Sequence, residues 1–194
     1  MSDSPDVVIA KVGLRTSLLA RRASRPPEAR RAAARAVAGH LRARLSGVVA
    51  GYVPAPEEPG AEELVEALGP RVLLPVVPPS GRVLSWAWSD GELAAGRYGL
   101  LEPVGPRLPA ETLAEADVVV VPALAVGADG ARLGRGGGFY DRALAHARAG
   151  AVLVGVVFDE ELLDAVPAEP HDARLHAVVT PSRGWLDLGV ARHP

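Results

Sequence analysis

The hydrophobic positions of this chain recur in short runs that have the length of β-strands. These runs are rich in Val, are bounded by Gly or Pro, and are apolar at nearly every position. Strands that are covered on both faces show this pattern, because neither face meets water. The pattern predicts buried strands over Val48–Val53, Val72–Val77, Val118–Val121, Ala151–Phe158 and Ala177–Thr180.

Helical patterns lie between these runs. The prolines at 26–27 precede a stretch that places Ala34, Val37, Leu41 and Leu45 on one face, and Pro is favoured at the start of a helix. Two shorter patterns, each followed by a glycine, predict helices over Ala61–Leu68 and Phe139–Arg148. The basic segment 11–25 is expected to fold as a helix rather than to serve as a transit peptide.

The alternation of strands and helices predicts an α/β protein, a three-layer sandwich with a largely parallel sheet. One segment differs, because Leu84, Trp86 and Trp88 fall on one face at a spacing of two. This spacing indicates a half-exposed strand that is antiparallel and lies at an edge of the sheet. We expect residues 1–194 to form a single domain, with the first few residues as a loose tail, because no long linker divides the chain.

Composition narrows the classes of function. The formal net charge of −2 argues against a dedicated nucleic-acid or membrane-surface protein. The absence of Cys excludes disulfides, thiolate metal sites and a cysteine nucleophile. No apolar run approaches the roughly 20 residues of a membrane helix, and the first residues lack the pattern of a secretory signal. We therefore expect a cytoplasmic protein without nucleic-acid or membrane partners, and nothing in the sequence requires more than a monomer.

The segment Asp117–Arg142 carries most of the chemical information. A predicted strand leads into the loop Gly134–Gly138, which a predicted helix follows. Glycines let backbone N–H groups approach an anion, and the start of a helix favours negative charge. Arg132 and Arg135 flank this loop and can add charge-assisted bonds to phosphate oxygens. Asp141, in the first turn of the helix, is placed to hold a magnesium ion.

A simpler interpretation of the same residues is a tight turn followed by a helix. Asp is favoured in a first helical turn in any case, by about 0.3–1 kcal/mol. The loop is not a Walker A motif, and it lacks the dinucleotide fingerprint because Phe139 stands at the position of the third glycine. From these residues alone, a phosphate site and a structural turn both remain open.

The order of residues from Gly130 to Arg142, Gly-x-Arg-Leu-Gly-x-Gly-Gly-Gly-Phe-Tyr-Asp-Arg, resembles the signature of the 5-formyltetrahydrofolate cyclo-ligases, or 5,10-methenyltetrahydrofolate synthetases. The resemblance extends over nearly the whole chain. An early Lys-x-x-x-Arg element is matched by Lys11, the only lysine, and Arg15. Other elements of the family are matched at Gly99, Glu102-Pro103, Val166-Pro167, His171-Asp172 and Thr180.

The resemblance implies a fold that is Rossmann-like in outline without the dinucleotide fingerprint. It implies conversion of 5-formyltetrahydrofolate to 5,10-methenyltetrahydrofolate, with ATP consumed to ADP and phosphate and with Mg²⁺ required. In this chemistry the formyl oxygen takes the γ-phosphoryl group, N10 attacks the activated carbon, and phosphate leaves. Phosphorylation improves a poor leaving group, and the protein contributes mainly by positioning and by neutralising charge.

The resemblance also implies roles for individual residues. Lys11, Arg135 and Tyr140 are the expected catalytic residues, and Asp141 and Asp172 the expected Mg²⁺ ligands. The expected ATP-binding residues are Lys11, Arg15, Arg132, Leu133, Gly134, Arg135, Gly136, Gly137, Gly138, Phe139 and Tyr140. The expected folate-binding residues are Arg15, Glu58, Arg135, Gly136, Gly137, Gly138 and Phe139.

Two parts of the sequence leave alternatives open. Pro59-Gly60-Ala61 follows Glu58 where the family has an acidic residue and Thr, so the folate end of the site is the least constrained. A related ATP-using enzyme that acts on a different formylated or phosphorylated metabolite is one alternative, and a non-enzymatic module that binds folate or nucleotide is another. Glu102-Pro103 either shapes the site or forms a turn. Trp86 and Trp88 are expected to pack in the fold and not in the site.

Overall fold

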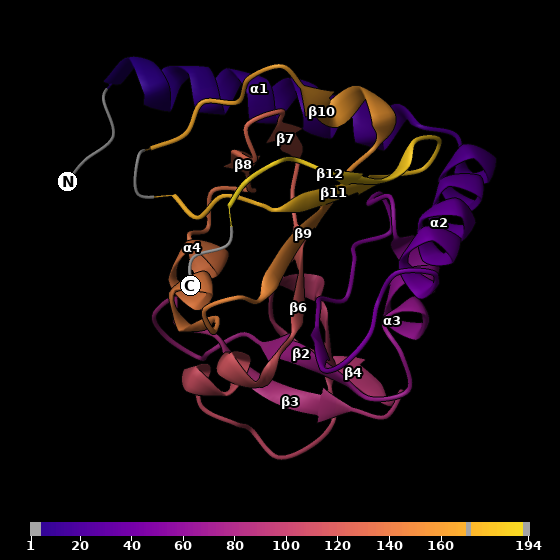
Figure 1. Ribbon diagram of the computed structural model, residues 1–194, viewed down its shortest axis with the longest axis vertical. Coiled ribbons are helices and arrows are strands. Elements are labelled where there is room, and N and C mark those ends of the chain that lie inside the picture. Colours follow the sequence, from indigo (N-terminus) through magenta and orange to yellow (C-terminus); the bar gives the residue numbers. More distant parts are fainter. Residues whose placement is uncertain (1–4, 170–171, 192–194) are drawn as a thin grey trace.

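The computed structural model describes residues 5–169 and 172–191, and its centre is a seven-stranded sheet (Figure 1). The predicted loose tail falls outside the described residues. The strand order is β12-β11-β9-β6-β1-β2-β3. The inner strands pair in parallel, and β3 and β12 add antiparallel edges, so the predicted largely parallel sheet is confirmed. The strands are β1 (Val49–Ala50), β2 (Val72–Val76), β3 (Ser85–Ser89), β6 (Val118–Pro122), β9 (Val152–Val156), β11 (Ala177–Thr180) and β12 (Gly184–Asp187).

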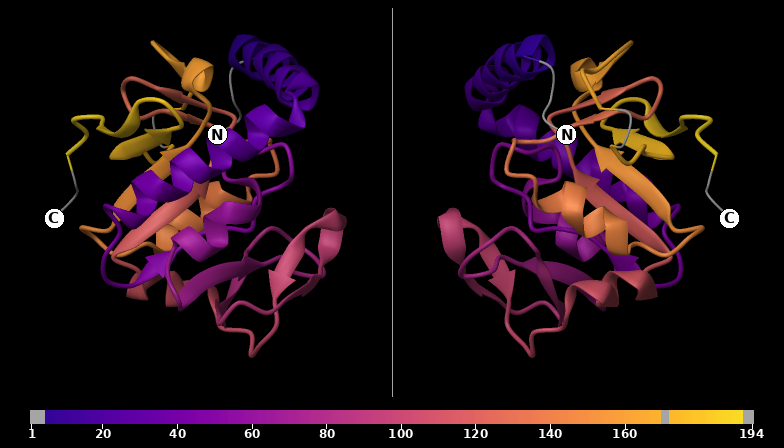
Figure 2. Two further views of the ribbon diagram at one scale, coloured as in Figure 1. Left: turned by 90° about the vertical axis from the view of Figure 1, so that its right-hand side faces the viewer. Right: turned by 90° about the vertical axis from the view of Figure 1, so that its left-hand side faces the viewer.

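Helices cover both faces of this sheet, and this explains why the strands are apolar at nearly every position (Figures 1 and 2). On one face, Val120 packs in one cluster with Leu41 of α2 (Pro27–Arg42) and with α3 (Leu64–Ala67). On the other face, Val119 packs with α4 (Phe139–Ala143) and with 3-10 turns at Ala110–Glu115 and Leu144–His146. Successive residues of β6 therefore enter different cores, as the alternation of a strand requires.

The N-terminal helix α1 (Pro5–Ser24) crosses the top of the molecule in Figure 1. Beneath it lies a three-stranded sheet of order β10-β7-β8. Leu18 of α1 packs with Leu124 and Leu133 from this layer, in a third core cluster. The basic segment 11–25 is thus part of a folded helix, as predicted. The small strands are β7 (Ala125–Gly127), β8 (Arg132–Leu133) and β10 (Leu162–Leu163).

Strand β3 is antiparallel to β2 and lies at the edge of the sheet, as predicted. The predicted half exposure is wrong, because Ala87 and Ser89, on the face opposite Trp86, are buried as well. Residues after the hairpin of β4 (Leu93–Ala95) and β5 (Leu101–Pro103) return along β3. There the backbones of Trp86 and Leu108 exchange hydrogen bonds of 3.0 and 2.7 Å. A covered edge cannot template the pairing of another chain.

The helix predicted over Phe139–Arg148 is shorter than expected. It ends as an α-helix at Ala143 and tightens into the 3-10 turn Leu144–His146. The chain must then reverse at Gly150, whose φ is 83°, to enter β9. Likewise, the helix predicted over Ala61–Leu68 begins as the 3-10 turn Ala61–Glu63 before α3. Helix ends commonly adopt this tighter form.

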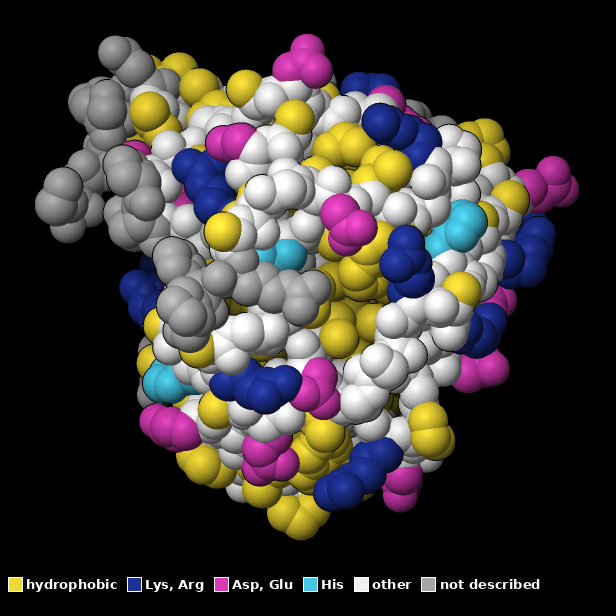
Figure 3. Space-filling view, in the orientation of Figure 1, with side chains coloured by type: hydrophobic (Ala, Val, Ile, Leu, Met, Phe, Trp, Pro, Cys, Tyr) yellow, Lys and Arg dark blue, Asp and Glu magenta, His cyan; other side chains and the backbone are white. Residues whose placement is uncertain are grey.

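Charged side chains are mixed over the face shown in Figure 3, where Lys and Arg alternate with Asp and Glu. Ion pairs form among the charged side chains of the described residues, such as Arg174 with Asp129 at 2.8 Å. Within the described residues, none of the helices combines the length and the apolarity that a membrane crossing requires.

Replacing Gly130 by Ala is expected to destabilise the fold by about 1–3 kcal/mol, because a residue with a Cβ is strained in the left-handed region. Gly130 has φ of 81°, and a Cβ there would overlap the carbonyl oxygen of Leu175. Gly150→Ala is the matched control, because its φ is 83° and nothing lies within 4 Å of a Cβ. Urea unfolding measures both variants, and equal losses would show that the overlap contributes nothing.

Candidate active site

The topology of the parallel strands marks one position for a ligand. In the order β2-β1-β6-β9-β11, the chain first adds β2 on one side of β1 and then returns to add β6, β9 and β11 on the other side. The switch point of the sheet therefore lies between β1 and β6. Ligands in open α/β sheets bind beyond the carboxyl ends of the strands at such a switch point. A cavity of about 640 Å³ lies there, and residues just after β1, such as Tyr52, and just after β6, such as Ala123, line it.

This cavity brings together every site residue that the sequence predicts. They come from α1, from the loop after β1, from the segment that runs from β8 into α4, and from the chain before β11. Because these segments are far apart in sequence, only the fold makes them neighbours. The predicted residues that line the cavity are Lys11, Arg15, Glu58, Arg132, Leu133, Gly134, Arg135, Gly136, Gly137, Gly138, Phe139, Tyr140, Asp141 and Asp172.

Helix α1 carries two cations to the glycine loop. Lys11 and Arg15 are four residues apart and therefore share one helix face. The Arg15 Nε donates a hydrogen bond of 2.9 Å to the carbonyl oxygen of Gly134. The Lys11 Nζ lies 3.9 Å from the Asp172 Oδ2, and the Lys11 side chain is only 12% exposed. His171, which precedes Asp172, lies outside the described residues.

The glycine loop takes a backbone path that other residues would disfavour. Gly136 and Gly138 have φ of 93° and 68°, and Gly138 caps the start of α4. A Cβ on Gly134 would lie 2.7 Å from the Arg132 Nη1. Arg132 also forms an ion pair with Asp141 and donates a 3.2 Å hydrogen bond to the carbonyl oxygen of Pro122. The loop and its neighbours therefore bring cations and open backbone to the cavity.

Glu58 places a carboxylate in the cavity wall, where it is only 6% exposed. Its Oε2 accepts a hydrogen bond of 2.9 Å from the backbone N–H of Ala55. Its Oε1 accepts hydrogen bonds from Arg135, at 3.3 Å from Nε and 3.1 Å from Nη2. The Arg135 Nη2 also donates to Glu57 at 3.0 Å. Partial burial alone would lower the pKa of Arg135, but the two carboxylates raise it above its ordinary value.

Two tyrosines form part of the cavity wall, and both stay neutral near pH 7. Burial raises the pKa of Tyr140 far above its usual range, although Arg132 acts in the opposite direction. Burial, followed by the nearby Glu58 carboxylate, also raises the pKa of Tyr52. The Tyr140 hydroxyl donates to the carbonyl oxygen of Gly51 at 3.4 Å. Tyr140 can therefore serve as a hydrogen-bond donor, but not as a general base.

Other cavity residues were not predicted from the sequence. Tyr52 follows a short strand and carries no motif, so no sequence signal identifies it. Glu102, for which a shaping role remained open, is buried in the wall and accepts a 3.0 Å hydrogen bond from the N–H of Val77. Arg82 and Leu101 line the same cavity. The family-like element that ends in Glu102-Pro103 was the available signal for this part of the wall.

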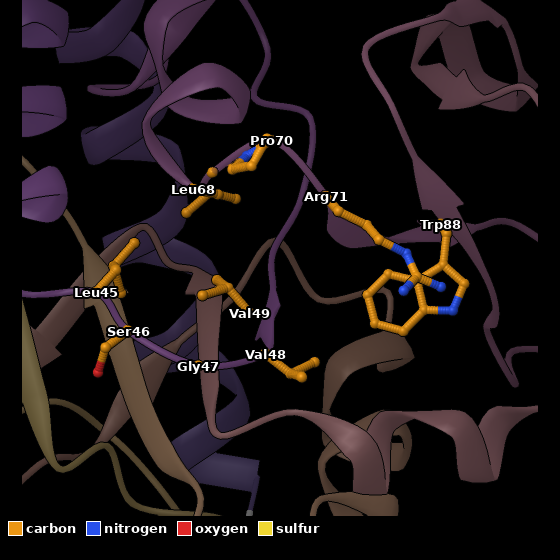
Figure 4. Close-up of a pocket in the computed structure, with 10 residues that line it drawn as sticks. Leu45, Ser46, Gly47, Val48, Val49, Leu68, Pro70, Arg71 and Trp88 are labelled. Carbon is orange, nitrogen blue, oxygen red and sulfur yellow. The ribbon is translucent and has the colours of Figure 1, made fainter.

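A second hollow, of about 400 Å³, lies near the amino ends of β1 and β2 (Figure 4). Aliphatic side chains and backbone line most of it. Arg71 stacks on the Trp88 ring at 4.2 Å from its centroid. Trp86 lines neither hollow, and Trp88 lines only this one. The chemical groups that converge at the first cavity have no counterpart here.

The fold and the cavity define an α/β protein that can bind an anionic group and a hydrogen-bond donor in one site. A family model described as the 5-formyltetrahydrofolate cyclo-ligase family matches residues 8–181. A 5-formyltetrahydrofolate cyclo-ligase of Mycolicibacterium smegmatis is 50% identical over 189 residues, covering 92% of this chain and 97% of the relative. One of Escherichia coli K12 is 35% identical over 148 residues, or 73% of this chain and 81% of the relative.

Solved structures agree with these sequence matches. The structure of Aquifex aeolicus 5,10-methenyltetrahydrofolate synthetase has a TM-score of 0.74 and 27% identity, with 95% of both chains covered. That of a 5,10-methenyltetrahydrofolate synthetase from Mycoplasma pneumoniae has a TM-score of 0.66 at 19% identity, covering 87% of this chain and 96% of the other, and supports the fold alone. The chain belongs to the 5-formyltetrahydrofolate cyclo-ligase family, whose members are enzymes that form a carbon–nitrogen bond.

Proposed function

We propose that this enzyme uses ATP and Mg²⁺ to convert 5-formyltetrahydrofolate to 5,10-methenyltetrahydrofolate, with release of ADP and phosphate. The observation that carries the proposal is the single cavity at the switch point. Its lining includes the cations Lys11, Arg15 and Arg132 near the glycine loop, and the buried carboxylate of Glu58. The cations suit phosphates, and the carboxylate suits the N–H donors of a pteridine ring.

The proposed reaction has two steps. The formyl oxygen attacks the γ-phosphorus of ATP, and the bond from phosphorus to the ADP oxygen breaks. N10 then attacks the formyl carbon, the carbon–oxygen bond breaks as phosphate leaves, and N10 loses its proton. Such phosphoryl transfer depends on positioning and on neutralised charge. Lys11, Arg15, Arg132 and the loop residues would hold the phosphates, and Arg135 would follow the transferred group.

Asp141 and Asp172 are the proposed ligands of Mg²⁺. The described residues contain no group of three or more His, Cys, Asp or Glu side chains that could hold a metal. This donor set fits Mg²⁺, which is commonly bound by one or two carboxylates together with substrate phosphates and water. Both carboxylates line the cavity, and each now faces a cation, Arg132 or Lys11. When bound, Mg²⁺ supplies neutralisation of phosphate charge.

The assignment of Glu58 to folate binding is supported by the position of the residues that depart from the family pattern. Pro59 and Gly60 are buried, and with Ala61 they lie outside the cavity lining. Of residues 54–61, only Ala55 and Glu58 line the cavity. The departure therefore leaves the carboxylate of Glu58 in place. A folate N–H donor would exchange with Arg135, which occupies Oε1.

We further infer that residues 1–194 act as one domain, because the cavity draws its walls from Lys11 through to Asp172. That the protein is a cytoplasmic monomer without nucleic-acid or membrane partners stays a prediction. The expectation of no nucleic-acid or membrane partner rests on the net charge of −2, and the absence of Cys is compatible with a cytoplasmic location. A monomer is expected because nothing in the sequence requires a larger assembly.

Mixing the purified protein with ATP, Mg²⁺ and 5-formyltetrahydrofolate tests the proposal. We expect the near-ultraviolet absorbance of the methenyl product to rise only when all three are present, with one ADP released per product. A protein that binds ATP but gives no product would point to a different formylated or phosphorylated substrate. Folate binding without ATP consumption would indicate a binding module.

A further inference from the structure

Arg22 is a buried arginine directly behind the cavity wall. It belongs to the last turn of α1 and is only 1% exposed. It does not line the cavity, and no motif in the sequence marks it. An arginine carries its charge under all ordinary conditions, so burying it requires anionic partners. The identity of these partners indicates what Arg22 does.

Most of the Arg22 guanidinium is fixed by hydrogen bonds to Glu161 and Ala123. Its Nε and Nη2 donate to the two carboxylate oxygens of Glu161, at 2.8 and 2.7 Å. Nη2 also donates to the carbonyl oxygen of Ala123 at 2.7 Å. Glu161 is itself held, because it accepts a 2.8 Å hydrogen bond from the N–H of Phe158. This bidentate arrangement leaves the guanidinium little freedom to turn.

The remaining nitrogen of Arg22 faces the site. Its Nη1 is buried and has no hydrogen-bond partner among the described residues. The Nη1 lies 3.7 Å from the Oε1 of Glu58, at ionic but not hydrogen-bonding distance. Burial by itself would lower the pKa of Arg22, yet Glu161 and Glu58 together raise it. Arg22 thus directs unused N–H groups at the carboxylate that we assign to folate.

The same oxygen of Glu58 has a second cation, and the two differ in mobility. Arg135 is bound to Oε1 from within the cavity, its side chain is 47% exposed, and it belongs to the glycine loop. Arg22 contacts Oε1 from behind and is almost fully buried. If Arg135 turns to the phosphates of ATP, Arg22 is the cation that stays with Glu58.

We propose that Arg22 is a positioning residue, the fixed counter-ion that keeps the Glu58 carboxylate aimed at the N–H donors of the pteridine. This inference rests on the proposed function. Without Arg22, the buried carboxylates of Glu58 and Glu161 would lose the cation between them. One of them would then turn toward water. A displaced Glu58 accepts fewer hydrogen bonds from the substrate.

The test is a double-mutant cycle that combines Arg22→Lys with Glu58→Gln. Arg22→Lys should disturb the hydrogen bonds between the Glu58 carboxylate and the pteridine. Because hydrogen bonds to a charged group are strong, this loss should raise the KM for 5-formyltetrahydrofolate by about 10-fold or more. The KM for ATP should change by less than the KM for folate, because the printed hydrogen bonds and ion pairs of Arg22 go to Glu161, Ala123 and Glu58 and not to the glycine loop. In the Glu58→Gln background, Arg22→Lys should add little further loss, since the carboxylate it serves is gone.

Arg25→Met is the matched control. Arg25 follows α1 and stacks on the Phe158 ring at 3.8 Å from its centroid, and Arg22 contacts the same ring at 5.8 Å. Arg25 pairs with Glu160 and not with a cavity residue. We expect Arg25→Met to leave both KM values within about two-fold of the wild type, because its ion pair is partly exposed.

Direct titration of 5-formyltetrahydrofolate accompanies the kinetics. Together they distinguish failure of the positioning role from failure of the proposed function. If the wild type turns over but Arg22→Lys raises both KM values equally, or adds its full loss to that of Glu58→Gln, the positioning role is overturned and the proposed function stands. If the wild type neither binds folate nor turns over, the proposed function and this inference both fail. If Arg22→Lys unfolds, Glu161→Gln is measured in the same cycle, with the same pattern expected.

Discussion

Asp141→Asn is expected to reduce kcat by about 10²-fold or more, because removal of one electrostatic contact to a developing charge commonly has this effect. The amide keeps the size of the side chain but loses the charge that would hold Mg²⁺. The Asp141 side chain is 55% exposed, and its ion pair with Arg132 lies at the cavity. Exposed pairs contribute little to stability, so the thermal midpoint should stay close to that of the wild type.

Steady-state kinetics over a range of Mg²⁺ concentrations measures this prediction. Asp129→Asn serves as the control, because Asp129 also forms an exposed pair, with Arg174, but lies outside the cavity. It should retain the activity of the wild type. Full activity in Asp141→Asn at low Mg²⁺ would show that the metal is held elsewhere.

Arg135→Met is expected to lower kcat/KM for ATP by about 10²-fold, since a cation that follows the transferred phosphoryl group acts on the transition state. The effect of Arg135→Met on folate binding should have the opposite sign. Arg135 occupies Oε1 of Glu58 and also pairs with Glu57. Removing it frees an acceptor for the pteridine, so folate titrated without ATP should bind at least as tightly as to the wild type.

Titration of each substrate alone, followed by turnover, separates the two effects. Arg174→Met is the control, because it removes an arginine from an ion pair outside the cavity. Weaker folate binding in Arg135→Met would mean that Arg135 contacts folate directly or holds the Glu58 loop in shape. Such a result would favour a substrate-binding role for Arg135 over movement of the Arg135 side chain from Glu58 to the ATP phosphates.

Both predictions depend on how charges are shared within the site. Asp141 and Asp172 each face a cation, and Glu58 faces Arg135 and Arg22. Binding of ATP and Mg²⁺ would redistribute these pairs, because phosphates attract the arginines and the metal attracts the aspartates. We therefore expect the two substrates to influence each other's binding, as linked sites must.

Much of the fold follows from local patterns in the sequence. Val-rich runs identified the inner strands, and Ala177–Thr180 has the observed bounds of β11. The helix after the prolines at 26–27 begins at Pro27. These features are predictable because burial on both faces and the fixed φ of Pro act on neighbouring residues. The long glycine motif indicated the family for the same reason, since its residues are consecutive.

Tertiary structure decided the features that depend on distant segments. Trp86 was expected on a half-exposed edge, but Leu108 covers that edge. The hairpin of β4 and β5 and the small sheet under α1 gave no clear periodicity, because their strands are only two or three residues long. Short strands depend on partners elsewhere in the chain and carry little pattern of their own.

The site divides in the same way. The sequence by itself determined which residues carry the charges, from Lys11 and Arg15 to Asp141. Only the folded chain brought Arg22 behind Glu58 and Arg135 in front of it, because these residues are 36 and 77 positions from Glu58 in the sequence. Charges interact through space, and burial strengthens their interaction, whereas a sequence pattern records only the separation of residues along the chain.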